Sequence, residues 1–176
     1  AKKKYNFQVH YPGSGVGGPC LPINSYQLLN TARRTGTKLS IVESGRKINE
    51  KMPDHTVELT SDAFQECNKS IQDSEILILG VSYKPNVKDI QLSPAEHIIE
   101  KFQNLGANVH IYDPNFSSTE VFGIKVEDNL DDVLSKMDAA VIVTGHDDFK
   151  KIEISSFAKM KTPILIDTRG IIEPQS

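Results

Sequence analysis

An unbroken apolar run at residues 75–81, Glu-Ile-Leu-Ile-Leu-Gly-Val, constrains the fold of this 176-residue chain most strongly. A strand without polar alternation has to be buried on both faces, which is typical of a parallel sheet covered by helices. Alternating segments follow it: helix 93–105, strand 108–112, short strand 123–126, helix 130–136, strand 139–144, helix 154–160 and strand 164–167. This order predicts an α/β domain over residues 73–176 with a doubly wound, Rossmann-like parallel sheet.

Residues 1–72 carry helical patterns instead of strands. Helices are expected at 22–35 and 39–51, and a third from Pro53 to Ile71, because proline suits the first turn of a helix. Cys67 falls on the apolar stripe of the third helix, so we expect it to be a buried structural cysteine. These segments hold too few apolar residues for a large core. We therefore predict a small all-helical domain that precedes the sheet and forms a homodimer.

Composition excludes several classes of function. The net charge of −3 shows no basic excess, so no nucleic-acid partner is expected, and no apolar stretch is long enough for a membrane span. The two cysteines and five histidines show neither a disulfide framework nor metal-ligand spacing, so no metal site is expected. Because no signal peptide is recognisable, we expect a cytoplasmic protein.

The richest motif is Tyr-Pro-Gly-Ser-Gly-Val-Gly-Gly-Pro-Cys at residues 11–20. Its glycines allow the backbone to approach a ligand closely, and the flanking prolines Pro12 and Pro19 fix the direction of the chain. Cys20 stands directly before the first expected helix, where the free N–H groups and the helix dipole favour a thiolate. We therefore predict that Cys20 is a nucleophile.

The same segment satisfies Gly-x-Gly-x-x-Gly at residues 13–18, but its context is wrong for dinucleotide binding. That fingerprint needs a strand before it and a helix that opens at the third glycine. The run before the motif is short and contains Pro12, and Pro19 and Cys20 intervene before the helix. Asp113, which ends the second strand, stands where a ribose-binding acid would, but without the glycine loop that such a role requires.

Parallel sheets bind ligands at the carboxyl ends of their strands. Four segments follow predicted strands there: 83–91, 113–114, 145–146 and 168–170. They contain Lys84 and Arg169, which are suited to an anionic ligand such as phosphate, Arg169 as a planar fork and Lys84 as a point charge. Among the histidines, only His146 lies at this edge.

Motifs at 12–22, 83–90 and 93–95, completed by Asp-Thr-Arg at 167–169, resemble the UDP-glucose/GDP-mannose dehydrogenase family. The glycine loop is most similar to the branch that oxidises UDP-N-acetylmannosamine. The resemblance covers nearly the whole chain, which corresponds to the later part of a family member. The N-terminal NAD-binding domain is therefore expected to lie outside this chain, and the chain alone is expected to be inactive.

The resemblance implies an enzyme that oxidises the C6 alcohol of a UDP-hexose or UDP-N-acetylhexosamine to a carboxylate with two NAD+. It implies that Cys20 forms a thiohemiacetal and then a thioester, beside Asn24 as the second catalytic position. Substrate binding is implied for Tyr11, Gly13, Gly15, Gly17, Tyr83, Lys84 and Arg169. Contact with NAD is implied for Cys20, Leu21, Pro22, Ile23 and Gln91.

Several residues depart from the family pattern. Asn24 stands where the family usually has an aspartate that assists thioester hydrolysis, and an amide cannot accept a proton as a carboxylate does. Gln91 replaces an arginine near NAD, Leu92 replaces a glutamate, and Pro19 often corresponds to histidine. Slow deacylation is the hypothesis that follows.

Two other classes of function stay open. One is a non-catalytic UDP-sugar-binding or regulatory module, which Asn24 and Gln91 favour. The other is an interaction module without a ligand, against which Lys84 and Arg169 argue. The sequence leaves open which sugar is oxidised.

Overall fold

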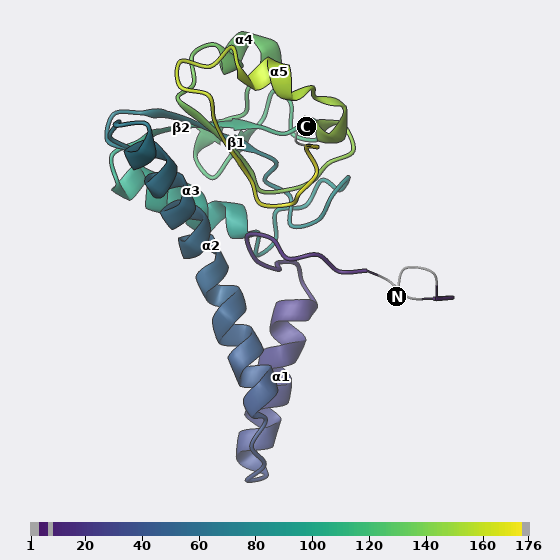
Figure 1. Ribbon diagram of the computed structural model, residues 1–176. Coiled ribbons are helices and arrows are strands. Elements are labelled where there is room, and N and C mark those ends of the chain that lie inside the picture. Colours follow the sequence, from purple (N-terminus) through teal and green to yellow (C-terminus); the bar gives the residue numbers. More distant parts are fainter. Residues whose placement is uncertain (1–3, 7–8, 174–176) are drawn as a thin grey trace.

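The computed structural model describes residues 4–6 and 9–173. The elements are α1 (Leu21–Arg34), α2 (Ser40–Glu66), β1 (Glu75–Leu79), α3 (Pro94–Asn104), β2 (Asn108–Tyr112), β3 (Glu120–Val121), β4 (Ile124–Lys125), α4 (Leu130–Leu134), β5 (Ala139–Ile142), the 3-10 helix η1 (Phe149–Lys151), α5 (Ile154–Phe157) and β6 (Ile164–Asp167). Figure 1 shows a layered α/β domain from which α1 and the first half of α2 project as a helical hairpin, called the arm below.

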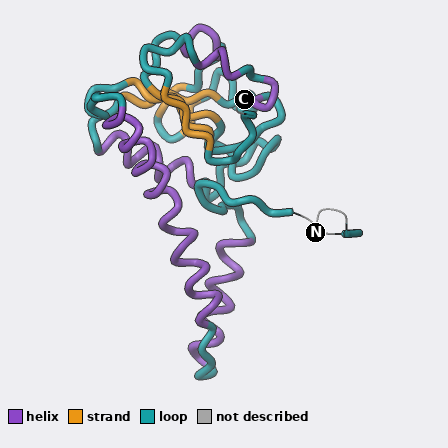
Figure 2. Tube along the Cα trace, in the orientation of Figure 1, coloured by secondary structure: helices purple, strands orange, loops and turns teal. Residues whose placement is uncertain are grey.

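The main sheet has the strand order β2-β1-β5-β6, and every pair in it is parallel. Figure 2 shows its strands in the middle of the domain, between helices. Side chains of β1 alternate between two cores because successive residues of a strand face opposite sides. Ile76 and Ile78 join a core with α2 and α3, whereas Leu77 and Leu79 join one with α4 and α5. The predicted doubly wound parallel sheet is confirmed.

The predicted break at Pro53 is wrong, because α2 is one helix that runs through it. Proline removes one helical N–H and leaves the carbonyl of Asn49 without its helical donor. Packing outweighs this local cost. Pro53 is buried, as are Thr56, Val57 and Phe64 on the turns that follow, so the helix continues into the core.

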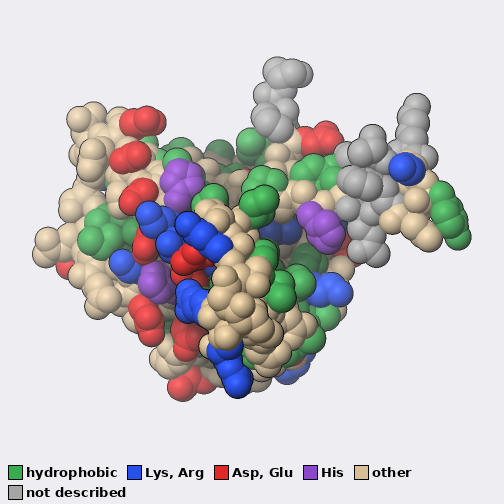
Figure 3. All heavy atoms as spheres, turned by 90° about the horizontal axis from the view of Figure 1, so that it is seen from below, with side chains coloured by type: hydrophobic (Ala, Val, Ile, Leu, Met, Phe, Trp, Pro, Cys, Tyr) green, Lys and Arg blue, Asp and Glu red, His purple; other side chains and the backbone are tan. Residues whose placement is uncertain are grey.

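The two halves of α2 have different surroundings. Val57 and Phe64 in the second half belong to the core on the sheet. The first half, on the arm, leaves Ile41 90% and Ile48 63% exposed. Figure 3, which views the molecule from below, shows green hydrophobic side chains next to blue Lys and Arg side chains on this surface. The predicted domains, 1–72 and 73–176, stay a prediction, and parts of them (1–3, 7–8 and 174–176) lie outside the described residues.

The short strand expected at 123–126 is present as β4, but it pairs with β3 in an antiparallel hairpin that turns at Gly123 with φ +75°. Val126, just after β4, forms a bridge to Ile111 of the main sheet. One smaller prediction is wrong. Cys67 is exposed rather than buried. It follows the last helical residue of α2, and the buried face of that helix ends one turn earlier, at Phe64.

Candidate functional site at the carboxyl edge of the sheet

The glycine loop packs directly on the segment that follows β1. The backbone N–H of Gly18 donates a 2.9 Å hydrogen bond to the carbonyl of Gln91. A Cβ on Gly18 would lie 2.7 Å from the ring of Tyr83, and one on Gly17 would overlap the carbonyl oxygen of Leu92. Leu92 presents that oxygen from a left-handed conformation with φ +51°, which is costly for a leucine. Glycine is required here because two backbones touch.

The loop also reaches the end of β6. A Cβ on Gly13 would overlap the guanidinium of Arg169, so that side chain packs directly against the glycine. The hydroxyl of Ser14, which is 1% exposed, donates a 2.7 Å hydrogen bond to Oγ1 of Thr168. Asp167 accepts the Arg169 N–H at 2.9 Å and so shapes the turn that carries the arginine. Ser14 and Thr168 are site-building residues that the sequence analysis missed.

A third contact joins the loop to α2 at the proline. Asn49 accepts the N–H of Val16 at 2.8 Å and donates to the Val16 carbonyl at 3.3 Å. A Cβ on Gly15 would lie 3.4 Å from the Asn49 carbonyl oxygen and 3.7 Å from Cδ of Pro53. The carbonyl that Pro53 leaves free therefore faces the loop, and Pro53 marks where the loop meets the helix.

Cys20 is the N-cap residue of α1, which confirms the predicted position just before the first helix, and its side chain is exposed. The N–H of Asn24 donates to the Cys20 carbonyl at 2.9 Å, so the two residues stand one helical turn apart on one face. Of the other predicted cofactor contacts, Leu21 and Ile23 are exposed and Pro22 is buried. Both side chains of the predicted catalytic pair are thus open to a ligand.

The remaining predicted residues surround the same edge. Tyr83 is half-buried beside Gly18, and Arg169 is half-buried beside Gly13, whereas Tyr11, Lys84 and Gln91 are exposed. The structure therefore brings the glycine loop together with Tyr83 and Arg169. The roles of all these residues in binding and catalysis stay predictions.

Asp113 does not have the surroundings of a ribose-binding acid. It is 0% exposed and accepts hydrogen bonds from the Val81 and Asn115 amides, both at 2.9 Å, and from His146 at 3.1 Å. Burial by itself raises the pKa of Asp113, but these hydrogen bonds outweigh burial and hold the pKa below its ordinary value. The carboxylate is fully engaged inside the protein, so this sheet does not present it to NAD.

The cavities at the site differ in size and charge. A space of about 30 Å³ between the loop and the sheet edge, lined by Gly15, Tyr83 and Arg169 among others, is only large enough for about one water molecule. A hollow of about 600 Å³ lies on the other side of Gly15, lined among others by Arg46, Glu50, Glu96, His97 and Glu100. Its three glutamates disfavour a diphosphate.

The described residues hold neither a metal-binding cluster nor a membrane-spanning helix. Among residues 4–6 and 9–173, no group of three or more His, Cys, Asp or Glu side chains is arranged to hold a metal ion. No helix in the described part of the chain has the length and apolar character of a membrane span.

A doubly wound sheet with a glycine-held cysteine and cations at its carboxyl edge defines the class of a nucleotide-binding α/β protein. Comparison with known families agrees with this class. Residues 77–174 match the UDP binding domain of the UDP-glucose/GDP-mannose dehydrogenase family, and residues 1–51 match its central domain. The chain belongs to the UDP-glucose/GDP-mannose dehydrogenase family.

Individual relatives are identical to this chain at about a third of the aligned positions. UDP-N-acetyl-D-mannosamine dehydrogenase of Pyrococcus horikoshii is 35% identical over 94% of this chain, and UDP-glucose 6-dehydrogenase TuaD of Bacillus subtilis is 33% identical over 90% of it. The solved structure of UDP-D-ManNAc dehydrogenase from Pyrococcus horikoshii superposes with a TM-score of 0.85 at 33% identity, covering 99% of this chain and 40% of that one. The chain spans only 38% and 35% of the length of the two sequence relatives.

Proposed function

We propose that this chain is the UDP-sugar-binding and thiol-bearing part of a nucleotide-sugar 6-dehydrogenase, with UDP-N-acetylmannosamine as the favoured substrate. The observation that carries the proposal is the seating of the glycine loop on Tyr83 and Arg169, immediately before the exposed Cys20. A cation suited to a diphosphate and a thiol suited to covalent catalysis thereby come to one edge from distant parts of the chain.

The proposed reaction oxidises the C6 alcohol of the sugar to a carboxylate, and two NAD+ would accept the two hydrides. The described residues do not fit a complete NAD site, because Gly80 directly after β1 is followed by no further glycine before Pro94, and the Asp113 carboxylate is occupied by internal hydrogen bonds. The cofactor would be held mainly by a separate NAD-binding domain. The first turn of α1, with Leu21 and Ile23 exposed, is the part of this chain that would face it.

The covalent steps of the proposed reaction would take place on the thiol of Cys20. Its sulfur would add to the C6 aldehyde, and the thiol proton would pass to the former carbonyl oxygen to give a thiohemiacetal. Loss of a hydride from that carbon and of the hydroxyl proton to solvent would leave a thioester, and water would cleave the carbon–sulfur bond to release the carboxylate and the thiol. Asn24, one turn further on the same face, can hold this water by hydrogen bonds but cannot take its proton.

Titration of the chain with UDP tests the binding part. Arg169→Lys keeps the charge but loses the planar fork, so we expect the Kd for UDP to rise about tenfold, and further in Arg169→Ala. Arg33→Ala, which removes an exposed arginine of the arm paired with Glu43 at 3.8 Å, is the matched control and should leave the Kd unchanged. A wild-type chain that does not bind UDP would contradict the proposal.

Intact mass of a full-length enzyme mixed with UDP-N-acetylmannosamine and NAD+ tests the covalent part. An adduct of the mass of the sugar nucleotide acyl group should form on Cys20 and be absent from Cys20→Ser. UDP binding without any adduct or oxidation would instead support the alternative, a non-catalytic UDP-sugar-binding module. The amide of Asn24 is the observation that favours that alternative.

The arm supports a proposed homodimer. Leu28, Ile41 and Ile48 are 51%, 90% and 63% exposed, and apolar side chains exposed along a projecting hairpin are typical of an interface. Sedimentation of the chain should show a dimer, and Ile41→Glu with Ile48→Glu should convert it to monomers. A wild-type chain that sediments as a monomer would rule the proposed interface out.

A further inference from the structure

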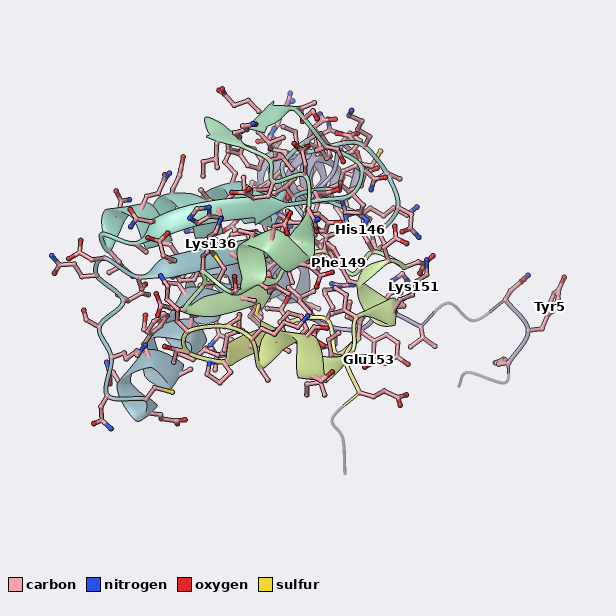
Figure 4. The ribbon with its side chains drawn as sticks, turned by 90° about the horizontal axis from the view of Figure 1, so that it is seen from above. Tyr5, Lys136, His146, Phe149, Lys151 and Glu153 are labelled. Carbon is pink, nitrogen blue, oxygen red and sulfur yellow. The ribbon has the colours of Figure 1, made fainter. Side chains whose placement is uncertain are left out.

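The buried pair Asp113 and His146 lies below the segment that carries Tyr83 and Lys84. Nε2 of His146 is 3.1 Å from Oδ2 of Asp113, and the two side chains are 1% and 0% exposed. The ring of Phe149 stands edge-on to that of His146, with centroids 5.3 Å apart, and Figure 4 shows these two residues next to each other. Water is therefore kept from the histidine, and its hydrogen-bond partners within the protein determine which ring nitrogen carries the proton.

Those partners assign the tautomer of His146. Nδ1 lies 2.9 Å from the backbone N of Asn86 and 3.3 Å from Nδ2 of Asn115. A backbone N–H can only donate, so Nδ1 has to be the unprotonated acceptor. The ring proton is therefore on Nε2 and is donated to Asp113. A carboxylate that orients an imidazole in this way selects one tautomer of the ring.

The acceptor nitrogen holds the turn of the substrate segment. Asn86 stands two residues after Lys84 with φ +60°, and its side chain exchanges two hydrogen bonds with Asp147, at 2.7 and 3.0 Å. At the start of the segment, Ser82 Oγ lies 2.6 Å from the carbonyl of Val87 and 3.4 Å from Oδ2 of Asp113. Both ends of the turn thus depend on the same buried pair.

We infer that Asp113 and His146 are positioning residues, which hold the turn at 82–87 so that Tyr83 and Lys84 face the bound nucleotide. The inference rests on the proposed function for the identity of the ligand. The pair acts without touching that ligand, because both side chains are buried. Asp113 keeps His146 in the tautomer that accepts from Asn86, and His146 fixes the backbone just after Lys84.

Two substitutions of His146 test the roles of Nδ1 and Nε2 separately. In His146→Asn the amide oxygen can take the place of Nδ1 and still accept from Asn86. In His146→Gln the amide nitrogen can take the place of Nε2 and still donate to Asp113, but the acceptor for Asn86 is lost. The amide proton of Asn86 should exchange with solvent at least tenfold faster in His146→Gln than in the wild type, and His146→Asn should restore its protection.

UDP binding provides the second readout. We expect His146→Gln to raise the Kd for UDP about tenfold and His146→Asn to stay within about threefold of the wild type. His110→Gln is the control, because His110 lies on β2 between Glu75 and Glu127, three residues before Asp113 and away from the turn. It should change stability but leave both Asn86 exchange and UDP binding as they are.

The outcomes distinguish this inference from the proposed function. If the wild-type chain binds no UDP, the proposed function fails, and Asn86 exchange still decides whether the pair holds the turn. Asn86 protection that persists in His146→Gln would overturn the inference. The ring nitrogens of the wild type give a test without any variant: ¹⁵N shifts that show a proton on Nδ1 of His146 would also overturn it.

Discussion

The hydroxyl of Ser14 donates a 2.7 Å hydrogen bond to Oγ1 of Thr168, across a separation of 154 residues. Oγ1 of Thr168 in turn donates to the carbonyl of Ile142 at 2.7 Å. The two bonds form a continuous chain from the glycine loop through the end of β6 to the end of β5. The loop that precedes Cys20 is therefore held by the sheet itself.

Thr168→Val should weaken this attachment. Valine keeps the shape but leaves the buried Ser14 hydroxyl without its acceptor, which we expect to cost about 1–3 kcal/mol. Urea unfolding measures the loss, and hydrogen exchange at the Val16 and Gly18 amides should show that it is centred on the loop. Thr31→Val, at an exposed position of α1, should change stability by less than about 0.5 kcal/mol. Equal effects of the two substitutions would contradict this role of Thr168.

Gly17→Ala should displace the loop from the segment after β1. The new Cβ would overlap the carbonyl oxygen of Leu92, and backbone cannot move aside as a flexible side chain can. We expect a loss of about 1–3 kcal/mol and weaker UDP binding. Gly45→Ala is the opposite case, since nothing lies within 4 Å of its Cβ and α2 should gain about 0.5–1 kcal/mol. Thermal unfolding of both variants checks these opposite signs.

Asp138 should make stability depend on acid pH. Burial by itself raises its pKa, but hydrogen bonds from the Glu75 amide at 3.1 Å, Lys69 at 3.3 Å and Thr162 at 3.2 Å outweigh burial, so the pKa lies below the ordinary 3.8. A lowered folded-state pKa adds stability above the unfolded-state pKa, and this is lost as the pH falls through the folded-state value.

Asp138→Asn should therefore unfold more easily than the wild type at neutral pH, by about 1–2 kcal/mol, and the difference should shrink below about pH 4. Unfolding in urea at several pH values measures it. Asp148→Asn breaks an exposed pair with Lys151 and should cost less than about 0.5 kcal/mol at any of them. A difference for Asp138→Asn that grows as the pH falls would contradict the argument.

Asn24→Asp tests the hypothesis of slow deacylation in a full-length enzyme. A carboxylate one turn after Cys20 can take a proton from the attacking water, so we expect turnover to rise about tenfold or more and the thioester adduct to decline. Single-turnover kinetics with intact mass follow both quantities. Asn30→Asp, exposed further along α1, is the control for the added charge. Unchanged hydrolysis in Asn24→Asp would exclude Asn24 as the limiting residue.

Local patterns predicted much of the fold and the position of the thiol. The apolar run at β1 indicated burial on both faces, and the structure places its alternate residues in two cores. Pro22 in the first turn of α1 and the glycines before it likewise located Cys20 at the N-cap. These features depend on neighbours within a few residues, so a sequence pattern is enough to find them.

Long-range packing set the features that the patterns missed. Pro53 is a helix breaker by local rules, yet the buried face around Val57 and Phe64 carries α2 through it. The sequence placed Asp113 at the position of a ribose-binding acid but without the glycine loop for that role, and only the approach of His146 from the end of β5 shows which partner the carboxylate has instead. No local pattern reports which distant partner a polar group will meet.

In the glycine loop, too, some features follow from the local sequence and others from the tertiary structure. Its composition was sufficient to predict a tight backbone approach and the position of Cys20 just before α1, because glycine and proline act on their own dihedral angles. The nucleophilic role of Cys20 stays a prediction. That Gly17 meets Leu92, Gly18 meets Tyr83 and Gly13 meets Arg169 was decided by the folding of the sheet. The carboxyl ends of parallel strands gather at one edge, which brings Tyr83 and Arg169 there, and the packing of the glycine loop on these residues places Cys20 beside that edge.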